Sequence, residues 1–499
     1  MTTANPQPDP AGQEANDSGP DARRTPDGLT VIGIGASAGG LAPLRTFFSA
    51  LPPNTGMTFV VVVHLSPEHE SMLPELLRDY TDMAVTQVQA RTPMQPNHVY
   101  VIPPAKRLVV AAGELDLEEL DQAPGRRLQI DTFFRTLAEQ HGDGAAIILS
   151  GTGSDGAVGM RAVKEEGGLL LVQAPQEAEY DGMPKSAIAT GLVDVVAPVA
   201  ELAAQLVAAK RTKETLELPA EPQDLAQREQ QTLLQILAQL RVRTGHDFSG
   251  YKEATLLRRI ARRMQLLQLN TLGDYLNRLR QDAEEVDALY RDVLIHVTEF
   301  FRDAEAWSVL ANDILPQLFE GKGPDDAVRV WTVGCATGEE AYSAAILLLE
   351  HAGQLNRPPQ IQVFASDLGR IALDFARKGI YPEAIAADVP EARLNRYFVH
   401  ENSHYQVRSE VRELVLFTPH NLLQDPPFSK LDLVICRNVL IYLQRPVQEH
   451  VFEAFHYALR PTGFLFLGSA ESTYGVTELF ETVDKRHRLY RRGAATTRA

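Results

Sequence analysis

Cysteine is scarce in this chain. The 499 residues contain two, Cys335 and Cys436, and neither belongs to a Cys-x-x-Cys pair. Paired cysteines are the usual basis of a structural zinc site, so we expect no metal centre of that kind. Two isolated thiols are typical of a protein from a reducing compartment such as the cytoplasm.

Long hydrophobic runs are also missing. The strand-like run Phe59–Val63 is far shorter than the roughly 20 apolar residues that a membrane-spanning helix needs. The first ten residues, MTTANPQPDP, show no basic region followed by an apolar core, so they do not predict a signal peptide. We therefore expect a cytoplasmic protein that does not insert into a membrane.

Positive charge is the third deficit. Lys and Arg number 48 against 65 Asp and Glu, which gives a formal net charge of −17. An acidic chain is soluble but poorly suited to non-specific binding of nucleic acid, and we expect no nucleic-acid partner.

Hydrophobic residues make up 44% of the chain, enough for several cores. Short apolar runs such as LTVIGIG, MTFVVVVH and LLLVQ alternate with helical stretches, which is typical of a parallel sheet covered on both faces. This pattern occurs twice and predicts two parallel-sheet α/β units joined through an all-helical module. The expected parts are a disordered tail (1–28), a first α/β unit (29–210), a linker (211–228), a helical module (229–297), a second α/β unit (298–492) and a polar tail (493–499).

Three predicted strand ends of the first unit carry the parts of a hydrolase triad. Ser37 lies in the turn G-A-S-A-G-G, His64 ends MTFVVVVH, and Asp155 lies in G-T-G-S-D-G after AAIILS. A hydroxyl, an imidazole and a carboxylate can serve as nucleophile, general base and orienting acid. Amides around Gly39 and Gly40 can donate hydrogen bonds to an oxyanion.

Each of these features has a plainer interpretation. A glycine-rich turn after a first strand also suits a phosphate-binding loop. A dinucleotide site, however, usually has Asp or Glu at the end of its second strand, where this chain has His64. A lone histidine or an aspartate in a glycine turn is commonly structural, so only their coincidence favours a triad.

Four motifs in residues 29–200 resemble the catalytic domain of CheB, the chemotaxis methylesterase: IGASAGG, VVVHLSP, LSGTGSDGAVGM and YDGMPKSAIATGLVD. The resemblance implies that Ser37 attacks a glutamyl methyl ester, that His64 takes its proton and that Asp155 orients His64. Family members also deamidate receptor glutamines. Two features depart from the family: the 28 preceding residues are too few for a phosphorylation-controlled receiver domain, and Thr152 stands where methionine is usual.

A second pattern of strand ends occurs in the C-terminal half. The run VRVWTV leads into G-C-A-T-G-E-E at 334–340, and IQVFASD ends in Asp367, a carboxylate suited to paired ribose hydroxyls. LDLVICRN ends in Arg437 and Asn438, which can face an adenine or the reacting centre. Taken alone, G-x-x-x-G also fits tight packing of a helix on a strand. Because no Walker-type loop is present, a nucleoside without a polyphosphate fits better.

Residues 229–492 resemble CheR, the chemoreceptor glutamate methyltransferase, through TEFFRD, WTVGCATGEEAYS, FASDL, FTPHNLL and CRNVLIYL. The resemblance implies a Rossmann-like class I methyltransferase fold that binds S-adenosylmethionine, with Glu340 on the methionine amino group and Asp367 on the ribose. One departure is His296, where the family has asparagine. The implied donor contacts are Thr298, Arg302, Glu340, Asp367, Asn421, Leu422, Asn438 and Val439.

The helix predicted at TLLRRIARRMQLLQL carries a cluster of arginines. At 100° per residue they share one arc, opposite an apolar side. Such an arc is ordinarily a solvated face, but in an acidic chain it can also bind an acidic partner. The resemblance to the CheR family implies that this region binds the acidic methylation helices of receptors. The cluster comprises Arg258, Arg259, Arg262 and Arg263.

The sequence therefore predicts two opposed enzymes in one chain, a protein-glutamate methylesterase and a protein-glutamate O-methyltransferase that act on chemoreceptors in sensory adaptation. Two alternatives stay open. The chain could be a sensory scaffold of another pathway with one or both sites weak, or the enzymes could act on a different carboxyl substrate.

Overall fold

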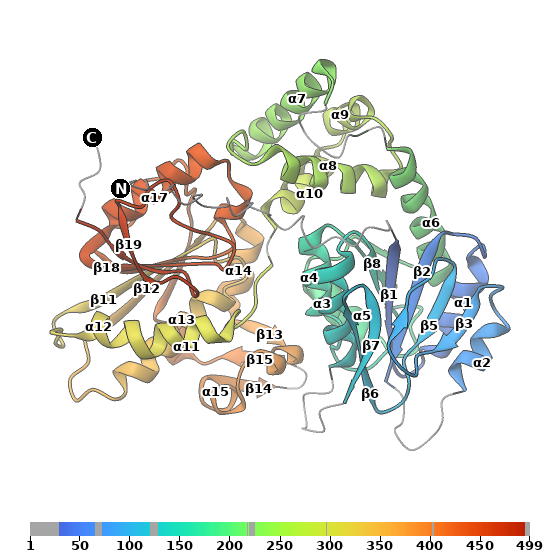
Figure 1. Ribbon diagram of the computed structural model, residues 1–499, viewed down its shortest axis with the longest axis horizontal. Coiled ribbons are helices and arrows are strands. Elements are labelled where there is room, and N and C mark those ends of the chain that lie inside the picture. The colour runs from blue at the N-terminus through green and yellow to red at the C-terminus, as the bar shows by residue number, and fades with distance from the viewer. Residues whose placement is uncertain are drawn as a thin grey trace, which may run out of the picture.

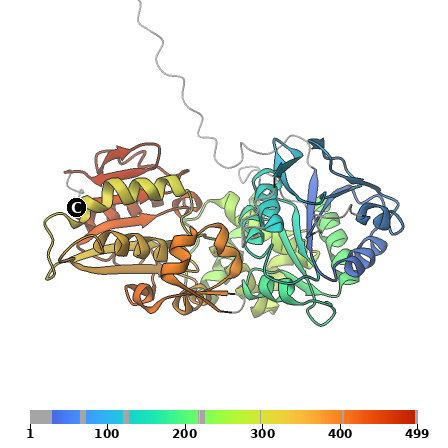
Figure 2. The same ribbon diagram turned by 90° about the horizontal axis from the view of Figure 1, so that it is seen from below.

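A computed structural model describes residues 29–64, 72–119, 128–216, 218, 225–295, 297–401 and 404–494. Two α/β units lie side by side, and a helical module lies above them and bridges them (Figure 1). The view from below shows the same two units side by side (Figure 2). Within the described residues, no helix is both long and apolar enough to cross a lipid bilayer.

The first unit contains a seven-stranded sheet in which every pairing is parallel. All seven residues of β1, TVIGIGA, are buried, because helices cover both faces of the sheet. Apolar cores lie on both sides of the sheet. In order across the sheet the strands are β10 (Val195–Ala197), β9 (Leu169–Gln173), β8 (Ala145–Ile148), β1 (Thr30–Ala36), β2 (Met57–Val63), β5 (His98–Val101) and β3 (Ala84–Gln87).

A small antiparallel sheet flanks this unit and packs against α3. It contains β4 (Thr92–Pro93), β7 (Glu114–Glu119) and β6 (Lys106–Ala111). The helices of the unit are α1 (Leu41–Ala50), α2 (Leu73–Arg78), α3 (Gln129–His141), α4 (Gly159–Glu166), α5 (Gly182–Ala189) and α6 (Val199–Thr215).

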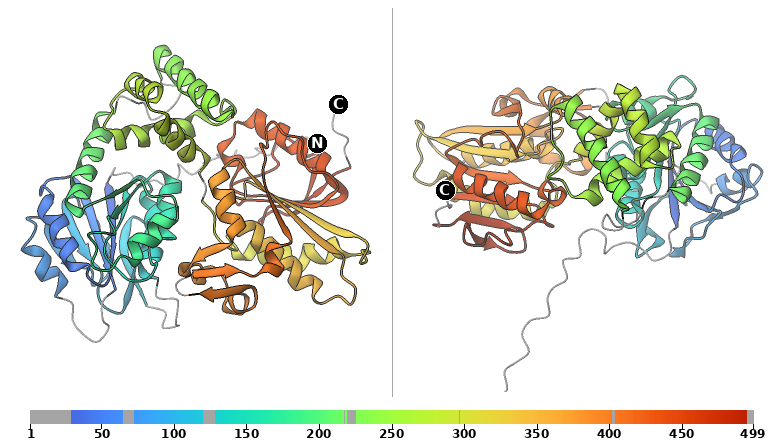
Figure 3. Two further views of the ribbon diagram at one scale, coloured as in Figure 1. Left: turned by 180° about the vertical axis from the view of Figure 1, so that it is seen from behind. Right: turned by 90° about the horizontal axis from the view of Figure 1, so that it is seen from above.

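The helical module follows α6, which continues to Thr215 and so extends into the segment expected to be a linker. Side-chain caps start two of its helices: Thr271 accepts a hydrogen bond from the amide of Asp274, and Asp282 accepts from those of Glu284 and Glu285. The views from behind and above show the module joining the two units (Figure 3). Its helices are α7 (Gln227–Thr244), α8 (Glu253–Leu267), α9 (Leu272–Gln281) and α10 (Ala283–Leu294).

The second unit has a mostly parallel sheet of seven strands, with β20 antiparallel to both of its neighbours. The prediction of two parallel-sheet units around a helical module is therefore confirmed. Across the sheet the strands are β16 (Val415–Pro419), β12 (Gln360–Asp367), β11 (Ala327–Val333), β17 (Leu431–Cys436), β18 (Leu459–Leu467), β20 (Leu489–Arg492) and β19 (Phe480–Asp484).

A three-stranded antiparallel sheet is inserted between β12 and β16. Its strands are β13 (Ile380–Pro382), β15 (His404–Val407) and β14 (Phe398–Glu401). The helices of the second unit are α11 (Ala304–Val309), η3 (Leu310–Ile314), α12 (Leu315–Phe319), α13 (Glu339–Ala352), α14 (Arg370–Lys378), η4 (Glu383–Ala387), α15 (Glu391–Tyr397), α16 (Ser409–Arg412), η5 (Leu440–Tyr442) and α17 (Arg445–Ala458).

The arginine cluster on α8 does not form the exposed face that its spacing predicts. Arg259 is 4% exposed and Arg262 is 1% exposed. Arg259 donates to the backbone carbonyls of Lys164 and Glu165 at the end of α4. Arg263 forms an ion pair with Glu285 inside the helical module. The expectation that all four arginines meet a receptor is wrong for the buried pair, because the first unit of the same chain covers them.

Arg262 is the centre of a buried charge network between the first unit and the helical module. It forms ion pairs with Asp194 of the first unit and with Asp292 of α10, and donates to the carbonyl of Gly168. Lys164 of α4 pairs with the same two carboxylates. Buried charges are tolerated only when they are paired, so this network fixes how the two parts dock.

Replacing Arg262 by alanine is expected to lower the free energy of unfolding by about 3–5 kcal/mol, because two buried carboxylates lose one of the two cations of this network and Lys164 alone is left to pair with both. Urea unfolding followed by circular dichroism measures the change. The matched control is Arg258→Ala on the same helix, where the side chain is half-buried and a change within about 0.5 kcal/mol is expected. Equal unfolding midpoints for the two variants would show that the buried network does not contribute to the free energy of unfolding beyond what an ordinary surface arginine does.

Candidate active sites

The first candidate site lies at the carboxyl edge of the first parallel sheet. The ends of β1 and β2 pair in register, Ala36 with Val63, and β8 ends beside Gly35 of β1. Ser37 and His64 directly follow β1 and β2, and Asp155 lies in the turn between β8 and α4. The register of the strands therefore brings three residues from distant parts of the sequence to one place.

The three side chains form a hydrogen-bonded chain. His64 Nδ1 lies 3.2 Å from Ser37 Oγ, and His64 Nε2 lies 2.7 Å from Asp155 Oδ2. A carboxylate only accepts hydrogen bonds, so the contact with Asp155 requires the proton on Nε2. Nδ1 is then left as an acceptor that faces the serine hydroxyl, the state that a general base needs.

Asp155 is held by the start of α3, a contact that the sequence motifs did not reveal. Its Oδ2 accepts from the amide of Ile130 at 3.0 Å, and its Oδ1 accepts from the amide of Asp131 at 2.8 Å. The first amides of a helix lack partners within the helix and carry partial positive charge. The carboxylate therefore stays buried and correctly oriented toward His64.

A second carboxyl group, that of Asp131, lies beside Asp155. It is buried, and its Oδ1 accepts from the amide of Gly159 at the start of α4 at 2.5 Å. Burial, and next the nearby charge of Asp155, raise the pKa of Asp131 well above its usual range.

The turn that carries Ser37 is fixed by backbone bonds. The amide of Ser37 donates to the carbonyl of Ser150, and the amide of Gly40 donates to the carbonyl of Ser37. Gly40 is thus engaged within the turn, which corrects the expectation that its amide serves an oxyanion and leaves Gly39 as the donor to consider. Gly151 permits close packing here, since a Cβ on it would lie 2.2 Å from the sulfur of Met183.

The two departures from family sequence have different places. Thr152 is exposed in the turn before Asp155. His296 lies outside the described residues. A difference in esterase efficiency from Thr152 and in donor affinity from His296 stays an expectation.

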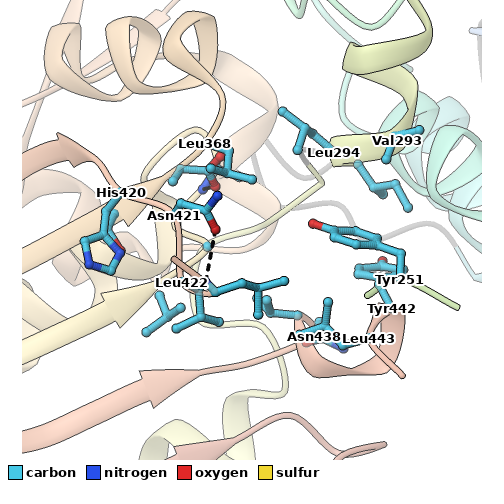
Figure 4. Close-up of a pocket in the computed structure, with 18 of the residues that line it drawn as sticks. Tyr251, Val293, Leu294, Leu368, His420, Asn421, Leu422, Asn438, Tyr442 and Leu443 are labelled. Carbon is cyan, nitrogen blue, oxygen red and sulfur yellow. Dashed lines mark hydrogen bonds between the residues drawn. The ribbon is translucent and has the colours of Figure 1, made fainter. Parts of the chain in front are cut away.

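The second candidate site is a pocket between the second unit and the helical module (Figure 4). It lies at the carboxyl edge of the second sheet, where β11, β12 and β17 end. All the predicted donor contacts line it: Thr298, Arg302, Glu340, Asp367, Asn421, Leu422, Asn438 and Val439.

Asp367, the last residue of β12, is anchored by backbone amides. Oδ2 accepts from Ala336 and Oδ1 from Gly369, each at 2.8 Å. An ionised carboxylate accepts hydrogen bonds, which is the complement that the two hydroxyls of a diol require. The position matches that expected for a ribose contact.

Glu340 lies at the start of α13 and faces two arginines. Its Oε2 lies 3.5 Å from Nη1 of Arg437. Burial raises the pKa of Glu340 to about 7, although the charges of Arg437 and Arg302 lower it, and Glu471 adds a further increase. A ligand ammonium placed here would favour the carboxylate form.

Glu471 holds the strand-end pair Asn438–Val439, and sequence motifs did not identify it. Its carboxylate accepts hydrogen bonds from the amides of Asn438, Val439, Leu440 and Gly468. Four donors satisfy a buried carboxylate and fix the loop that lines the pocket. The signal available in the sequence was a single glutamate in GSAES, which is too common a pattern to interpret.

Aromatic residues of the helical module complete the pocket and were also missed. His246 and Tyr251 line it from the segment between α7 and α8. His246 stacks on Tyr290 of α10 with the ring planes 6° apart. Figure 4 shows Tyr251, together with Tyr442 of η5 in the second unit, across the pocket from Asn421. These rings offer flat apolar surface for a base.

Arg437 lines the pocket, as its place at a strand end predicts, and it also anchors a neighbouring segment. Its guanidinium donates to the carbonyl of Arg302 at 2.8 Å, pairs with Asp303 at 2.6 Å and lies over the ring of Phe466. It therefore fixes the segment that carries Arg302.

The pocket fits S-adenosylmethionine by the chemistry of its lining. Asp367 suits a ribose diol, Glu340 an ammonium, and Arg302 a carboxylate. The apolar and aromatic walls suit an adenine.

Three family models match consecutive parts of the chain. They are CheB methylesterase (residues 32–206), the all-alpha domain of CheR methyltransferase (231–294) and the SAM binding domain of CheR methyltransferase (296–489).

Similar proteins match most of the chain or about half of it. A Rhodobacter capsulatus protein described as an uncharacterized 104.1 kDa protein is 36% identical over 446 residues, which cover 85% of this chain and 47% of that relative. The chain thus spans about half the length of that relative. Chemotaxis protein methyltransferase 2 of Vibrio cholerae is 31% identical over 244 residues, 48% of this chain and 84% of the relative. The chemotaxis protein methyltransferase of Escherichia coli is 33% identical, over 46% of this chain and 80% of the relative.

Among solved structures, the catalytic domain of the Thermotoga maritima CheB methylesterase aligns with 29% identity, over 36% of this chain and 97% of that one, with a TM-score of 0.34. From the family models and the methyltransferase relatives, this chain belongs to the CheR methyltransferase family and carries a CheB methylesterase domain ahead of its methyltransferase domains.

Proposed function

We propose that the chain is a bifunctional enzyme, a protein-glutamate methylesterase and a protein-glutamate O-methyltransferase. The observation that carries the esterase half is the hydrogen-bonded chain from Ser37 through His64 to Asp155. The pocket lined by all the predicted donor contacts carries the other half.

In the esterase, Ser37 Oγ attacks the ester carbonyl while His64 Nδ1 takes its proton. Asp155, bonded to Nε2, holds the ring and stabilises the imidazolium that forms. His64 then returns the proton to the departing methoxide, so methanol leaves and an acyl-serine remains. Water, activated by His64, hydrolyses that ester and regenerates the serine.

In the methyltransferase, a bound S-adenosylmethionine supplies an electrophilic methyl group. Asp367, Glu340 and Arg302 bind the polar parts of the donor and orient it. The accepting glutamate is already ionised at pH 7, so no general base is needed. Alignment of the carboxylate with the methyl group and exclusion of water from the pocket accelerate this in-line displacement.

The substrates we propose are glutamates in the cytoplasmic domains of methyl-accepting chemoreceptors, which places the enzyme in the cytoplasm. The buried arginines of α8 cannot supply the docking surface in this arrangement of the domains. The alternative of a scaffold with weak sites rests on the departures at Thr152 and His296. It is less favoured, since the triad and all the predicted donor contacts are present. Methanol release and label incorporation, measured with labelled donor and receptor-containing membranes, test both activities.

Replacing Ser37 by alanine is expected to abolish methanol release from methylated receptor, because the covalent route needs the hydroxyl. Incorporation of methyl label should continue, since the donor pocket is separate. Methanol release at the wild-type rate would show that Ser37 is not the nucleophile.

Asp367→Ala is expected to weaken binding of S-adenosylhomocysteine by about 1.5–3 kcal/mol, since the ribose loses a charged acceptor. This corresponds to roughly a tenfold or larger loss of affinity, measured by calorimetry. Asp374→Ala, at an exposed position on α14, is the control and should bind normally. Unchanged affinity of the Asp367 variant would exclude the ribose role.

Donor affinity should fall as the pH decreases below about 7. With the pKa of Glu340 raised to about 7, the free protein binds a proton there at lower pH. The donor ammonium needs the carboxylate form of Glu340, so binding must release that proton. At pH values well below this pKa, donor affinity should therefore fall by about tenfold per pH unit.

Calorimetry in two buffers of different ionisation enthalpy measures the released proton directly. Glu340→Gln should bind weakly and without this dependence on pH. A wild-type affinity that is constant between pH 6 and pH 8 would mean that Glu340 does not titrate on binding.

A further inference from the structure

Helix α4 of the esterase domain lies against the methyltransferase domain. Figure 1 shows α3 and α4 on the side of the esterase domain that faces the other α/β unit. The α4 side chain Arg161 crosses this boundary: Nη1 contacts Oε1 of Glu339 at 2.5 Å and donates to the carbonyl of Thr298 at 3.2 Å. One residue of the esterase domain thus touches Thr298, which lines the donor pocket, and Glu339, which adjoins a lining residue.

The Arg161–Glu339 pair is deeply buried. Arg161 is 6% exposed and Glu339 is 1% exposed. Glu339 also accepts a hydrogen bond from Thr337, and it directly precedes Glu340 at the start of α13. Without Arg161, a buried carboxylate would lose its cation in the same helical turn that presents Glu340 to the pocket.

The donor-contacting segment 298–302 depends on such anchors, because it lies between α10 and α11 and belongs to neither a helix nor a strand. Two further contacts come from the esterase domain. Arg135 of α3 lies 3.4 Å from Glu299, and Glu165 of α4 lies 3.3 Å from Arg302. From its own domain the segment is held by Arg437, through the carbonyl of Arg302.

We propose that Arg161, although it belongs to the esterase domain, is a positioning residue of the methyl-donor site. It links the carbonyl of Thr298 to the first turn of α13, so that Thr298, Arg302 and Glu340 keep the spacing that the donor requires. The inference rests on the proposed donor role of these three residues. Its consequence is that donor affinity depends on this particular contact with the esterase domain.

The test measures binding of S-adenosylhomocysteine to the full chain by calorimetry. Arg161→Gln should lower affinity by about tenfold or more, a size typical of coupling between sites. Arg161→Lys should recover part of that loss, because the ammonium can pair with Glu339 but lacks the planar fork of arginine. Thermal unfolding and methanol release confirm that the variants are folded.

The matched control is Lys164→Gln, one turn further along α4. Lys164 also forms ion pairs across the boundary, with Asp292 of α10, but it contacts neither Thr298 nor Glu339 in the described structure. Its variant should bind within about threefold of wild type. An equal loss in the Arg161 and Lys164 variants would overturn the proposal, since general loosening of the domains would then explain both.

A double-mutant cycle measures the coupling between Arg161 and Glu339 in donor affinity, which a general loss of stability would not produce. If Arg161 acts through Glu339, its effect on donor affinity should shrink when Glu339 is already Gln. Wild-type affinity in Arg161→Gln would overturn the proposal. If Asp367→Ala still bound more weakly in the same experiment, the assignment of the donor site would nevertheless hold. Loss of binding by wild-type protein would instead overturn the proposed function.

Discussion

Both candidate sites depend on one constraint, the common direction of strands in a parallel sheet. Because parallel strands end at the same edge, residues far apart in the sequence meet there without long connecting loops. In the esterase the register of β1, β2 and β8 brings Ser37, His64 and Asp155 within hydrogen-bonding distance. In the methyltransferase the ends of β11, β12 and β17 place Asp367 and Asn438 on one pocket.

The charges at these edges are stabilised mainly by backbone amides. Asp155 accepts from two amides of α3, Asp367 from those of Ala336 and Gly369, and Glu471 from four amides. Amides in a folded backbone cannot turn away as water or a flexible side chain can. The acidic groups are therefore held in place before any ligand binds, which lowers the cost of reorganisation on binding or reaction.

Strand ends and their motifs were readable from the sequence, since apolar runs and glycine turns are local patterns. The triad residues, Asp367 and Asn438 were found in that way, whereas the other predicted donor contacts came from the resemblance to the CheR family, and His246 and Tyr251 of the pocket lining were missed. The partners that hold them were not readable: the α3 amides under Asp155 and the carboxylate of Glu471 come from distant segments without a distinctive pattern. The helical spacing on α8 correctly predicted that its arginines share one face of the helix. Periodicity does not reveal what packs against that face, and here α4 of the same chain covers Arg259.

The boundary between the esterase and the rest of the chain is rich in buried ion pairs, such as Arg262 with Asp194 and Arg161 with Glu339. Such pairs add little net stability, because removing both charges from water offsets most of their attraction. They do penalise any shifted arrangement, in which a buried charge would lose its partner. A boundary of this kind favours one orientation of the domains, and that orientation is the one in which α4 contacts the segment carrying Thr298 and Arg302. The geometry of one site is thus tied to the packing of the domain that bears the other.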